Sequence, residues 1–270
     1  MKALLTIESI RLKRSLGSFL LAIGIPLFFF TLFSSTVQME QPEAQESFLI
    51  SYMLTMTSFS MSSFALFSFP MMLVEDQKNH WLSFLRHSPL PLWKYHLSKI
   101  LRVGICFLAS ILIVFLNGAF LRNIQLTPAT WLLSALLLLL TATVYLALGL
   151  CLQHIQSEQT LSLVANVLFL LLAILGGSWM PISLFPDWLQ GISKLTPSYH
   201  VNQLVVQYAL KGEFLWKSLL VVLGYAIIFY RAPLKTRSIP SYKKRRDSCP
   251  PISSKSPCIS YFSIPIIGRI

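Results

Sequence analysis

"WLLSALLLLLTATVYLALGLCL", residues 131–152, contains no Asp, Glu, Lys or Arg. An α-helix needs roughly 20 consecutive apolar residues to cross the hydrocarbon core of a bilayer, which is about 30 Å thick. The apolar residues here are continuous, whereas the strands of a membrane barrel alternate apolar and polar residues. The stretch therefore predicts a transmembrane α-helix and, with it, a helical membrane protein.

The rest of the chain repeats this pattern. Its composition, with 54% hydrophobic and 12% charged residues, lies outside the range of ordinary soluble domains. The first apolar run is too long for the core of a cleavable signal peptide, and no small-residue cleavage site follows it, so we expect a permanent anchor. We expect an all-α integral membrane protein built as a six-span helical bundle. The clear spans are 16–37, 48–74, 103–121, 131–152 and 161–179, and a shorter sixth is 215–230.

Basic residues indicate which side of the membrane each loop faces. Residues 1–15 and 75–102 are rich in Lys and Arg, whereas the loop 38–47, "QMEQPEAQES", carries glutamates and no base. Because Lys and Arg concentrate in short cytoplasmic loops, the N-terminus and the segment 75–102 are expected in the cytoplasm. Six spans would return the C-terminus to the same side, and a bacterial cytoplasmic membrane is the expected location.

The C-terminal residues differ in composition from the rest. Residues 231–270 are rich in Lys, Arg, Pro and Ser, include "KKRR" at 243–246, and show no helical periodicity. We expect a disordered cytoplasmic tail, for which attraction to anionic lipid is an alternative role and nucleic-acid binding is not expected. The sixth run breaks off at "FYRAPLKTRS", residues 229–238, as a shifted reading frame near the end of the gene would produce. The predicted domains are therefore a transmembrane domain, 1–230, and this tail, 231–270.

No sequence pattern typical of an enzyme is present. The chain lacks a phosphate-binding GxxxxGK[ST] loop, a GxSxG nucleophile motif and a HExxH zinc motif. Its Cys and His residues are scattered without the spacing of a metal site, so neither a catalytic residue nor a metal is expected. The predicted spans also lack a charged residue at mid-depth, which ion-coupled carriers generally keep. If the chain transports a substrate uphill, the energy is expected to enter from outside the bilayer.

The longest polar interruption before the tail is "EDQKNHWLSFLRHSPLPLWKYHLSKIL", residues 75–101. We expect a short interfacial helix led by Glu75 and Asp76, because acidic side chains complement the N-terminal end of the helix dipole. Pro89 is expected to end this helix, since proline disfavours helical geometry in the residue before it. The segment fits either a plain amphipathic helix on the membrane surface or a rigid cytoplasmic handle for a partner. Its apolar side consists of Trp81, Leu82, Phe84 and Leu85, beside Lys78, Arg86 and His87.

A second interruption is expected on the opposite side of the membrane, "GGSWMPISLFPDWLQGISKLTPSYHVNQLV", residues 176–205. Gly176 and Gly177 allow close helix packing or a break, and the prolines that follow separate two expected short helices. Helical spacing places the apolar residues of 186–195 on one side. Because these helices are too short to cross a bilayer, we expect them to dip into the outer leaflet or lie along it.

The first residues, "MKALLTIESIRLKRS", predict one more helix. Their apolar residues fall on one helical face, and their polar residues, Glu8 among them, fall largely on the other. Such a helix is expected to lie flat on the inner leaflet, with Glu8 turned away from the apolar side.

Together these segments resemble the permeases of type-2 ABC exporters over about residues 1–230. In 176–205 the similarity lies in the glycine-rich start and in the spacing of the prolines and Trp188. The tail is not covered by the resemblance. In the first interruption the similar features are the leading acid Glu75, "FLRHSP" at 84–89, an aromatic at Trp93 or Tyr95, and "LSKIL" at 97–101.

The resemblance implies a role for each segment. In this family the first interruption is a coupling helix that docks in a groove of a separate ATPase subunit, and the second closes the external end of the pathway. The implied ATPase-coupling residues are Glu75, Asp76, Trp81, Leu82, Leu85, Arg86 and Pro89. The implied residues of an outer re-entrant gate are Gly176, Gly177, Pro181, Phe185, Pro186, Trp188, Leu189 and Pro197.

The expected function is that of a membrane-spanning permease subunit of an ATP-driven exporter. The resemblance implies an ABC ATPase and a second permease as partners, in a homodimer or a heterodimer, besides membrane lipid. This chain is expected to bind no cofactor, because ATP and Mg²⁺ belong to the ATPase subunit. Two alternatives stay open: a membrane immunity or sensor component that uses the same ATPase without bulk transport, and a stand-alone carrier or channel. The substrate is not predicted, since aromatic spans suit apolar cargo and lipid contact alike.

Overall fold

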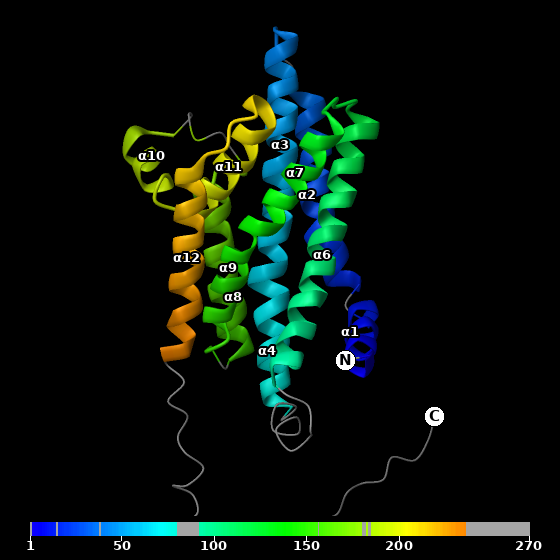
Figure 1. Cartoon of the computed structure of the whole chain (residues 1–270), viewed down its shortest axis with the longest axis vertical. Coiled ribbons are helices and arrows are strands. Elements are labelled where there is room, and N and C mark those ends of the chain that lie inside the picture. Colours follow the sequence, from blue (N-terminus) through cyan, green and yellow to red (C-terminus); the bar gives the residue numbers. More distant parts are fainter. Residues whose placement is uncertain are drawn as a thin grey trace, which may run out of the picture. The chain divides into compact units, whose positions relative to one another are not determined.

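Long helices lie side by side in a bundle (Figure 1). The computed structural model describes residues 2–14, 16–37, 39–79, 92–155, 157–179, 182 and 185–235, and this part of the chain contains helices and no strand. The helices are α1 (Lys2–Arg14), α2 (Leu16–Thr36), α3 (Pro42–Ser63), the π-helix η1 (Phe64–Ser68), α4 (Phe69–Lys78), α6 (Leu92–Leu121), α7 (Pro128–Thr141), α8 (Thr143–Leu152), α9 (Glu158–Leu175), α10 (Asp187–Ser193), α11 (Pro197–Lys211) and α12 (Trp216–Lys235).

Five helical stretches of the described chain are long and apolar enough to cross a membrane. They correspond to the five clear spans predicted from the sequence, so that prediction is confirmed. The sixth is different: α12 continues to Lys235, beyond the predicted end of the span at 230, and it is not among the five. The six-span arrangement therefore stays a prediction. The five stretches are Phe19–Thr36, Pro42–Lys78, Lys94–Leu121, Pro128–Leu152 and Glu158–Leu175.

The two ends of the bundle carry different short helices. At one end, α1 lies beside the last turns of α4 and the beginning of α6 (Figure 1). At the opposite end, α10 lies near α9, and α11 lies near both α9 and α3 (Figure 1). We call these the α1 end and the α10 end.

The second span changes its helical winding halfway along. Pro70 has no amide hydrogen, so it cannot give the carbonyl of Leu66 the bond of a regular α-helix. The chain widens into a π-helix before this proline, and the amide of Phe69 donates to the carbonyl of Phe64 instead. Gly149 of α8 packs directly against the carbonyl oxygen of Ala65 in this wide turn. The missing side chain at Gly149 thus allows α8 to approach the second span closely.

An alanine at Gly149 is expected to destabilise the protein by about 1–3 kcal/mol, the usual cost of overpacking a filled interior. Its Cβ would overlap the Ala65 carbonyl, and backbone atoms cannot rotate away. The matched control is Gly24→Ala, because nothing lies within 4 Å of a Cβ at that position. The midpoint of thermal unfolding in detergent should fall for the first variant and stay or rise for the second. Equal midpoints would contradict the close contact between α8 and the π-helix.

The fourth span is interrupted at Ala142, between α7 and α8. The Thr141 hydroxyl donates to the carbonyl of Leu137, and the Thr143 hydroxyl donates to the carbonyl of Leu140. Bonds of this kind from threonine to the preceding turn bend helices. The sequence predicted a single span over 131–152, which the stretch Pro128–Leu152 confirms, but it did not predict the interruption.

A buried hydroxyl network connects three helices in the middle of the bundle. The hydroxyl of Tyr145 in α8 donates to Ser198 of α11 over 3.2 Å and lies 3.2 Å from the hydroxyl of Ser58 in α3. The Tyr145 side chain is fully buried. Hydrogen bonds between helices stabilise bundles in lipid, where water cannot satisfy polar groups. This network therefore positions α11, a helix of the α10 end, against the second and fourth spans.

Candidate functional site

Charged side chains from three helices meet inside the protein at the α1 end. The group consists of Glu8 and Arg11 of α1, Asp76 of α4, and Tyr95, Lys99 and Arg102 of α6, and we call it the ionic cluster. Because α4 leads into residues 80–91 and α6 leads out of them, the cluster connects α1 to both helices that flank this segment.

Lys99 lies at the centre of the ionic cluster. Its Nζ is 2.7 Å from Glu8 Oε1 and 2.7 Å from Asp76 Oδ2. Arg102 Nη1 binds the other oxygen of Glu8 at 3.0 Å, and Arg11 Nη1 binds the other oxygen of Asp76 at 2.8 Å. The Tyr95 hydroxyl donates to Asp76 Oδ2 over 2.8 Å. Both carboxylates therefore use both of their oxygens.

These charges are held away from solvent. Asp76 and Lys99 are fully buried, and Glu8 and Arg102 are 7% and 8% exposed. A charge removed from water costs several kcal/mol unless close partners compensate for the lost hydration, and the short distances here provide that compensation. Partial burial alone would lower the pKa of the Arg11 guanidinium, but the bond to Asp76 and the nearby carboxylates outweigh it and raise that pKa.

The helical spacing of the residues explains how a few helical turns supply the whole ionic cluster. Glu8 and Arg11 are three positions apart on α1, and Tyr95, Lys99 and Arg102 are spaced by four and three positions on α6. Residues with this spacing share one face of a helix. α1 and α6 therefore each present a ready-made polar stripe, and the packing of the helices decides that these stripes meet each other and Asp76 of α4.

One prediction about these residues is wrong, and one contact was not predicted. Glu8 was expected on the face of α1 opposite the apolar residues, and the structure shows that this face packs against α6, so that Glu8 is buried while Ile10 is 48% exposed. Glu75 and Asp76 were expected to begin an interfacial helix, but they lie in the last turns of α4, which continues to Lys78. Carboxylates near a helix C-terminus are disfavoured by the helix dipole, and for Asp76 the pairs with Lys99 and Arg11 offset this cost.

Of the other predicted coupling residues, the structure describes Glu75, which is not part of the ionic cluster. Glu75 is exposed, next to the buried Asp76. Lys78 forms an exposed ion pair with Glu158 of α9, at 2.8 Å. The remaining members, Trp81, Leu82, Leu85, Arg86 and Pro89, lie outside the described residues, and their roles stay predictions.

At the α10 end, three predicted gate residues, Gly176, Gly177 and Pro197, lie at helix boundaries. Gly176 follows α9 and contacts Ser198, and the Asn202 amide donates to the Gly176 carbonyl over 2.7 Å. Pro197 is the buried first residue of α11. Gly177, the next residue after Gly176, has a φ of 73°, a left-handed backbone conformation that favours glycine. The structure therefore brings the glycines and the start of α11 together.

Of the other predicted gate residues that the structure describes, Phe185 and Pro186 precede α10, and Trp188 and Leu189 lie in its first turn. The carbonyl of Phe185 accepts a hydrogen bond from Gln190 over 2.8 Å. Trp188 is 67% exposed, and Leu189 is half-buried. Pro181 lies outside the described residues. The gating role of all these residues remains a prediction.

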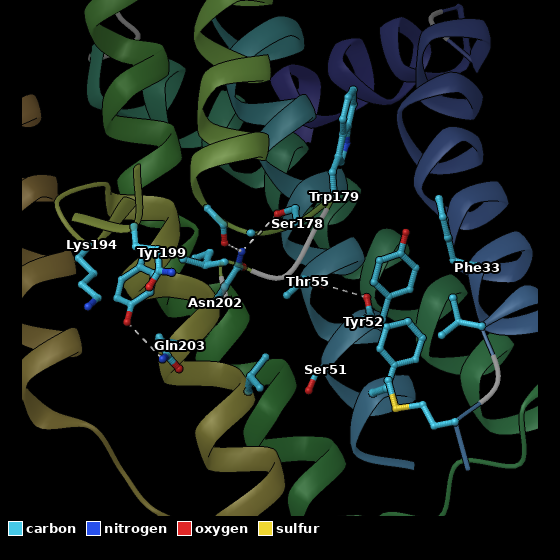
Figure 2. A pocket seen from close by; sticks show the side chains of 18 residues that line it. Phe33, Ser51, Tyr52, Thr55, Ser178, Trp179, Lys194, Tyr199, Asn202 and Gln203 are labelled. Atoms are coloured by element: carbon cyan, nitrogen blue, oxygen red, sulfur yellow. Dashed lines mark hydrogen bonds between the residues drawn. The ribbon is translucent and has the colours of Figure 1, made fainter. Parts of the chain in front are cut away.

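A pocket of about 750 Å³ opens beside this region (Figure 2). It lies between the end of α2, the beginning of α3, the turn after α9, and α10 and α11. Gly176 and Gly177 line it, whereas Pro186, Trp188 and Pro197 do not. Sequence reasoning missed the other lining residues; the available signal was the run of aromatic residues at the ends of the first two spans. They include Phe33, Phe48, Tyr52, Trp179, Tyr199 and Asn202.

Comparison with known proteins gives two matches. The family model described as an ABC-2 family transporter protein matches residues 30–234. YvfS of Bacillus subtilis (strain 168), a protein that is named as a transport permease, is 30% identical over 222 residues. That alignment covers 82% of this chain and 90% of the relative.

Proposed function

Because the chain belongs to the ABC-2 family of transporter proteins, we propose that it couples ATP hydrolysis in a partner subunit to export across the membrane. The family makes it a multi-pass membrane permease subunit, not an enzyme, and implies an ABC ATPase as partner. The outward direction and the docking of that ATPase on residues 75–101 are the finer parts of the proposal. ATP and Mg²⁺ would bind in the ATPase subunit and no cofactor in this chain.

The single observation that carries the proposal is the ionic cluster beside residues 80–91. α4 enters this segment and α6 leaves it, and buried ion pairs join both helices to α1. Breaking one buried pair costs about 3–5 kcal/mol, because a desolvated charge loses its partner. An ATPase that displaced the segment would therefore move α1, α4 and α6 together.

One continuous helix connects the ionic cluster to the pocket at the α10 end. The stretch Pro42–Lys78 carries Tyr52 in the pocket and Asp76 in the cluster. At 1.5 Å per residue, the distance along the helix between these two residues is roughly 36 Å. The π-helix lies between them, and such interruptions are frequent at functional sites. Movement at the cluster would thus reach the pocket through the second span.

The location of the helix ends supports a common side for the termini. α1, the end of α4 and the end of α12 lie at the same end of the bundle (Figure 1). With the basic residues of 1–15, this arrangement favours cytoplasmic N- and C-termini in a bacterial cytoplasmic membrane. We further propose that a second permease, the same chain or a homologous one, completes the pathway, in keeping with the two-fold symmetry of most assemblies.

The double variant Glu75→Lys, Trp81→Ala is expected to lower ATPase recovery about tenfold, which corresponds to about 1.4 kcal/mol of binding free energy. Glu75 is exposed beside the ionic cluster, so its reversal changes a docking surface and not the interior. The measurement is co-purification in mild detergent of the tagged chain with ATPases encoded by neighbouring genes.

The matched control for this experiment is Glu213→Lys, Trp216→Ala. Both residues are exposed at the beginning of α12, at the α10 end. This control should recover as much ATPase as the unmodified chain. If the Glu75 and Trp81 variant also recovered it fully, the coupling role of residues 75–101 would be refuted.

A further inference from the structure

We propose that the pocket at the α10 end binds an amphipathic molecule with a flat apolar body and an anionic head group that also donates a hydrogen bond. The pocket volume of about 750 Å³ is within the range of small-molecule sites, about 300–1,000 Å³. If the bound molecule is the exported substrate, this inference rests on the proposed function. The binding of such a molecule to the pocket does not depend on that function.

One wall of the pocket is aromatic. Phe33 comes from α2, Phe48 and Tyr52 come from α3, and Trp179 follows α9. Phe48 and Tyr52 are stacked with ring centroids 5.5 Å apart, and Phe33 meets Tyr52 edge to face at 5.8 Å. Figure 2 shows Phe33, Tyr52 and Trp179 on one side of the space. Packed ring faces of this kind bind planar apolar groups.

The opposite wall is polar. Lys194, Tyr199, Asn202 and Gln203 lie across the pocket from Phe33 and Tyr52 (Figure 2). Among the described residues that line the pocket, Lys194 is the single charged one. A negatively charged head group therefore gains an attractive partner there, whereas a cation meets a like charge and no carboxylate.

Asn202 adds a specific requirement for a donor. Its amide nitrogen donates to the Gly176 carbonyl and, over 3.2 Å, to the Ser178 hydroxyl, which orients the side chain. Its Oδ1 atom is buried and has no hydrogen-bond partner in the part of the chain that the structure describes. A buried acceptor without a partner costs about 1–3 kcal/mol, so a ligand N–H or O–H that displaced the atoms covering this oxygen would be favoured. The head group is thus expected to combine negative charge with a donor.

Photolabelling of the purified chain in phosphatidylcholine nanodiscs, without ATP or ATPase, tests this proposal. The probe is N-(4-benzoylbenzoyl)glycine, which has an aromatic ketone body, an amide N–H and a carboxylate. Matched probes replace glycine by sarcosine, which removes the N–H, by ethanolamine, which removes the charge, and by ethylenediamine, which reverses it. Labelled residues are mapped by mass spectrometry of peptides.

Saturable labelling is expected around Phe33, Tyr52 and the turn after α9. The glycine probe should exceed the sarcosine probe about twofold to tenfold, the range of a neutral hydrogen bond. It should exceed the ethanolamine probe about twofold to fivefold, the range of an exposed ion pair, and the cationic probe should label least. Labelling spread over the lipid-facing helices without saturation, or preference for the cationic probe, would overturn the proposal.

Two pairs of variants locate the contacts. Phe33→Ala should reduce labelling several-fold, whereas Phe28→Ala, on the same helix but outside the pocket, should not. Lys194→Ala should abolish the preference for the carboxylate, and Lys211→Ala, outside the pocket, should preserve it. Equal effects of Phe33→Ala and Phe28→Ala would contradict the role of the aromatic wall, and equal effects of Lys194→Ala and Lys211→Ala would contradict the role of the polar wall.

A comparison of lipids distinguishes two sources of such a ligand. In nanodiscs of equal parts phosphatidylcholine and phosphatidylglycerol, reduced pocket labelling would identify an anionic lipid, whose glycerol hydroxyls donate, as the occupant. Unchanged labelling would indicate a free amphiphile. Because no ATPase is present, saturable labelling would stand even if the co-purification experiment refuted the proposed coupling.

Discussion

An Asp76→Leu variant is expected to lose about 3–5 kcal/mol of its free energy of unfolding. Asp76 forms ion pairs with Lys99 and Arg11 and accepts a hydrogen bond from the Tyr95 hydroxyl, all at 2.7–2.8 Å. Without this carboxylate, the buried ammonium of Lys99 would be left with Glu8 alone as its acidic partner among the described residues. The large effect follows because an incompletely compensated charge remains in a desolvated interior.

Lys99→Met should destabilise the protein less, although Lys99 is equally buried. After this change, Glu8 still pairs with Arg102 and Asp76 still pairs with Arg11. The exposed pair of Lys78 and Glu158 provides the control, since Glu158→Gln should cost about 0–1 kcal/mol. Unfolding in mixed detergent micelles, followed by tryptophan fluorescence, measures all three variants. If Asp76→Leu cost no more than Glu158→Gln, the ionic cluster would not hold the α1 end together.

Gly176→Val is expected to have the second largest effect, about 3 kcal/mol, at the upper end of the usual overpacking cost. A Cβ at Gly176 would lie 2.5 Å from the Leu172 carbonyl oxygen and 2.5 Å from the Ser198 Cβ. Neither atom belongs to a flexible side-chain end, so α11 must move away from α9. That movement would also disturb the hydrogen bonds of Ser198 to Tyr145 and of Asn202 to the Gly176 carbonyl.

Gly191→Val is the matched control for this substitution, because nothing lies within 4 Å of a Cβ at Gly191 in α10. The midpoint of thermal unfolding in detergent compares the two variants. A Gly176 variant as stable as its control would mean that α9 and α11 do not pack through this glycine. Saturable photolabelling of the pocket in the same sample would show independently whether the pocket wall at Gly176 has changed.

Hydropathy predicted most of the bundle because a helix that crosses a membrane needs a continuous run of apolar residues, which can be recognised locally. The run at 131–152 needs no partner to be recognised as a span, and the same holds for the other four. Helix ends were predicted less well: α6 begins at Leu92, well before the predicted 103, because a helix can continue past the apolar core into its polar flank. The interruption at Ala142 and the π-helix before Pro70 coincide with single hydroxyls and one missing amide hydrogen, which hydropathy does not register.

The pairing of distant charges was beyond sequence reasoning. Glu8 has the spacing of a polar surface residue on an amphipathic helix, and nothing near it in the chain indicates that Lys99 will neutralise it. Asp76 likewise looked like the first turn of a new helix, because its stabilising partners are on other helices.

The sequence by itself determined that this protein is a helical membrane protein, and, through three polar segments, which family it resembles. Both conclusions depend on residues that are close together in the chain. The tertiary structure decided where the charges of α1, α4 and α6 meet and where the aromatic and polar walls of the pocket face each other. The physical reason is that burial of a charge, or an enclosed cavity, is a property of several helices packed together, and no single segment carries it.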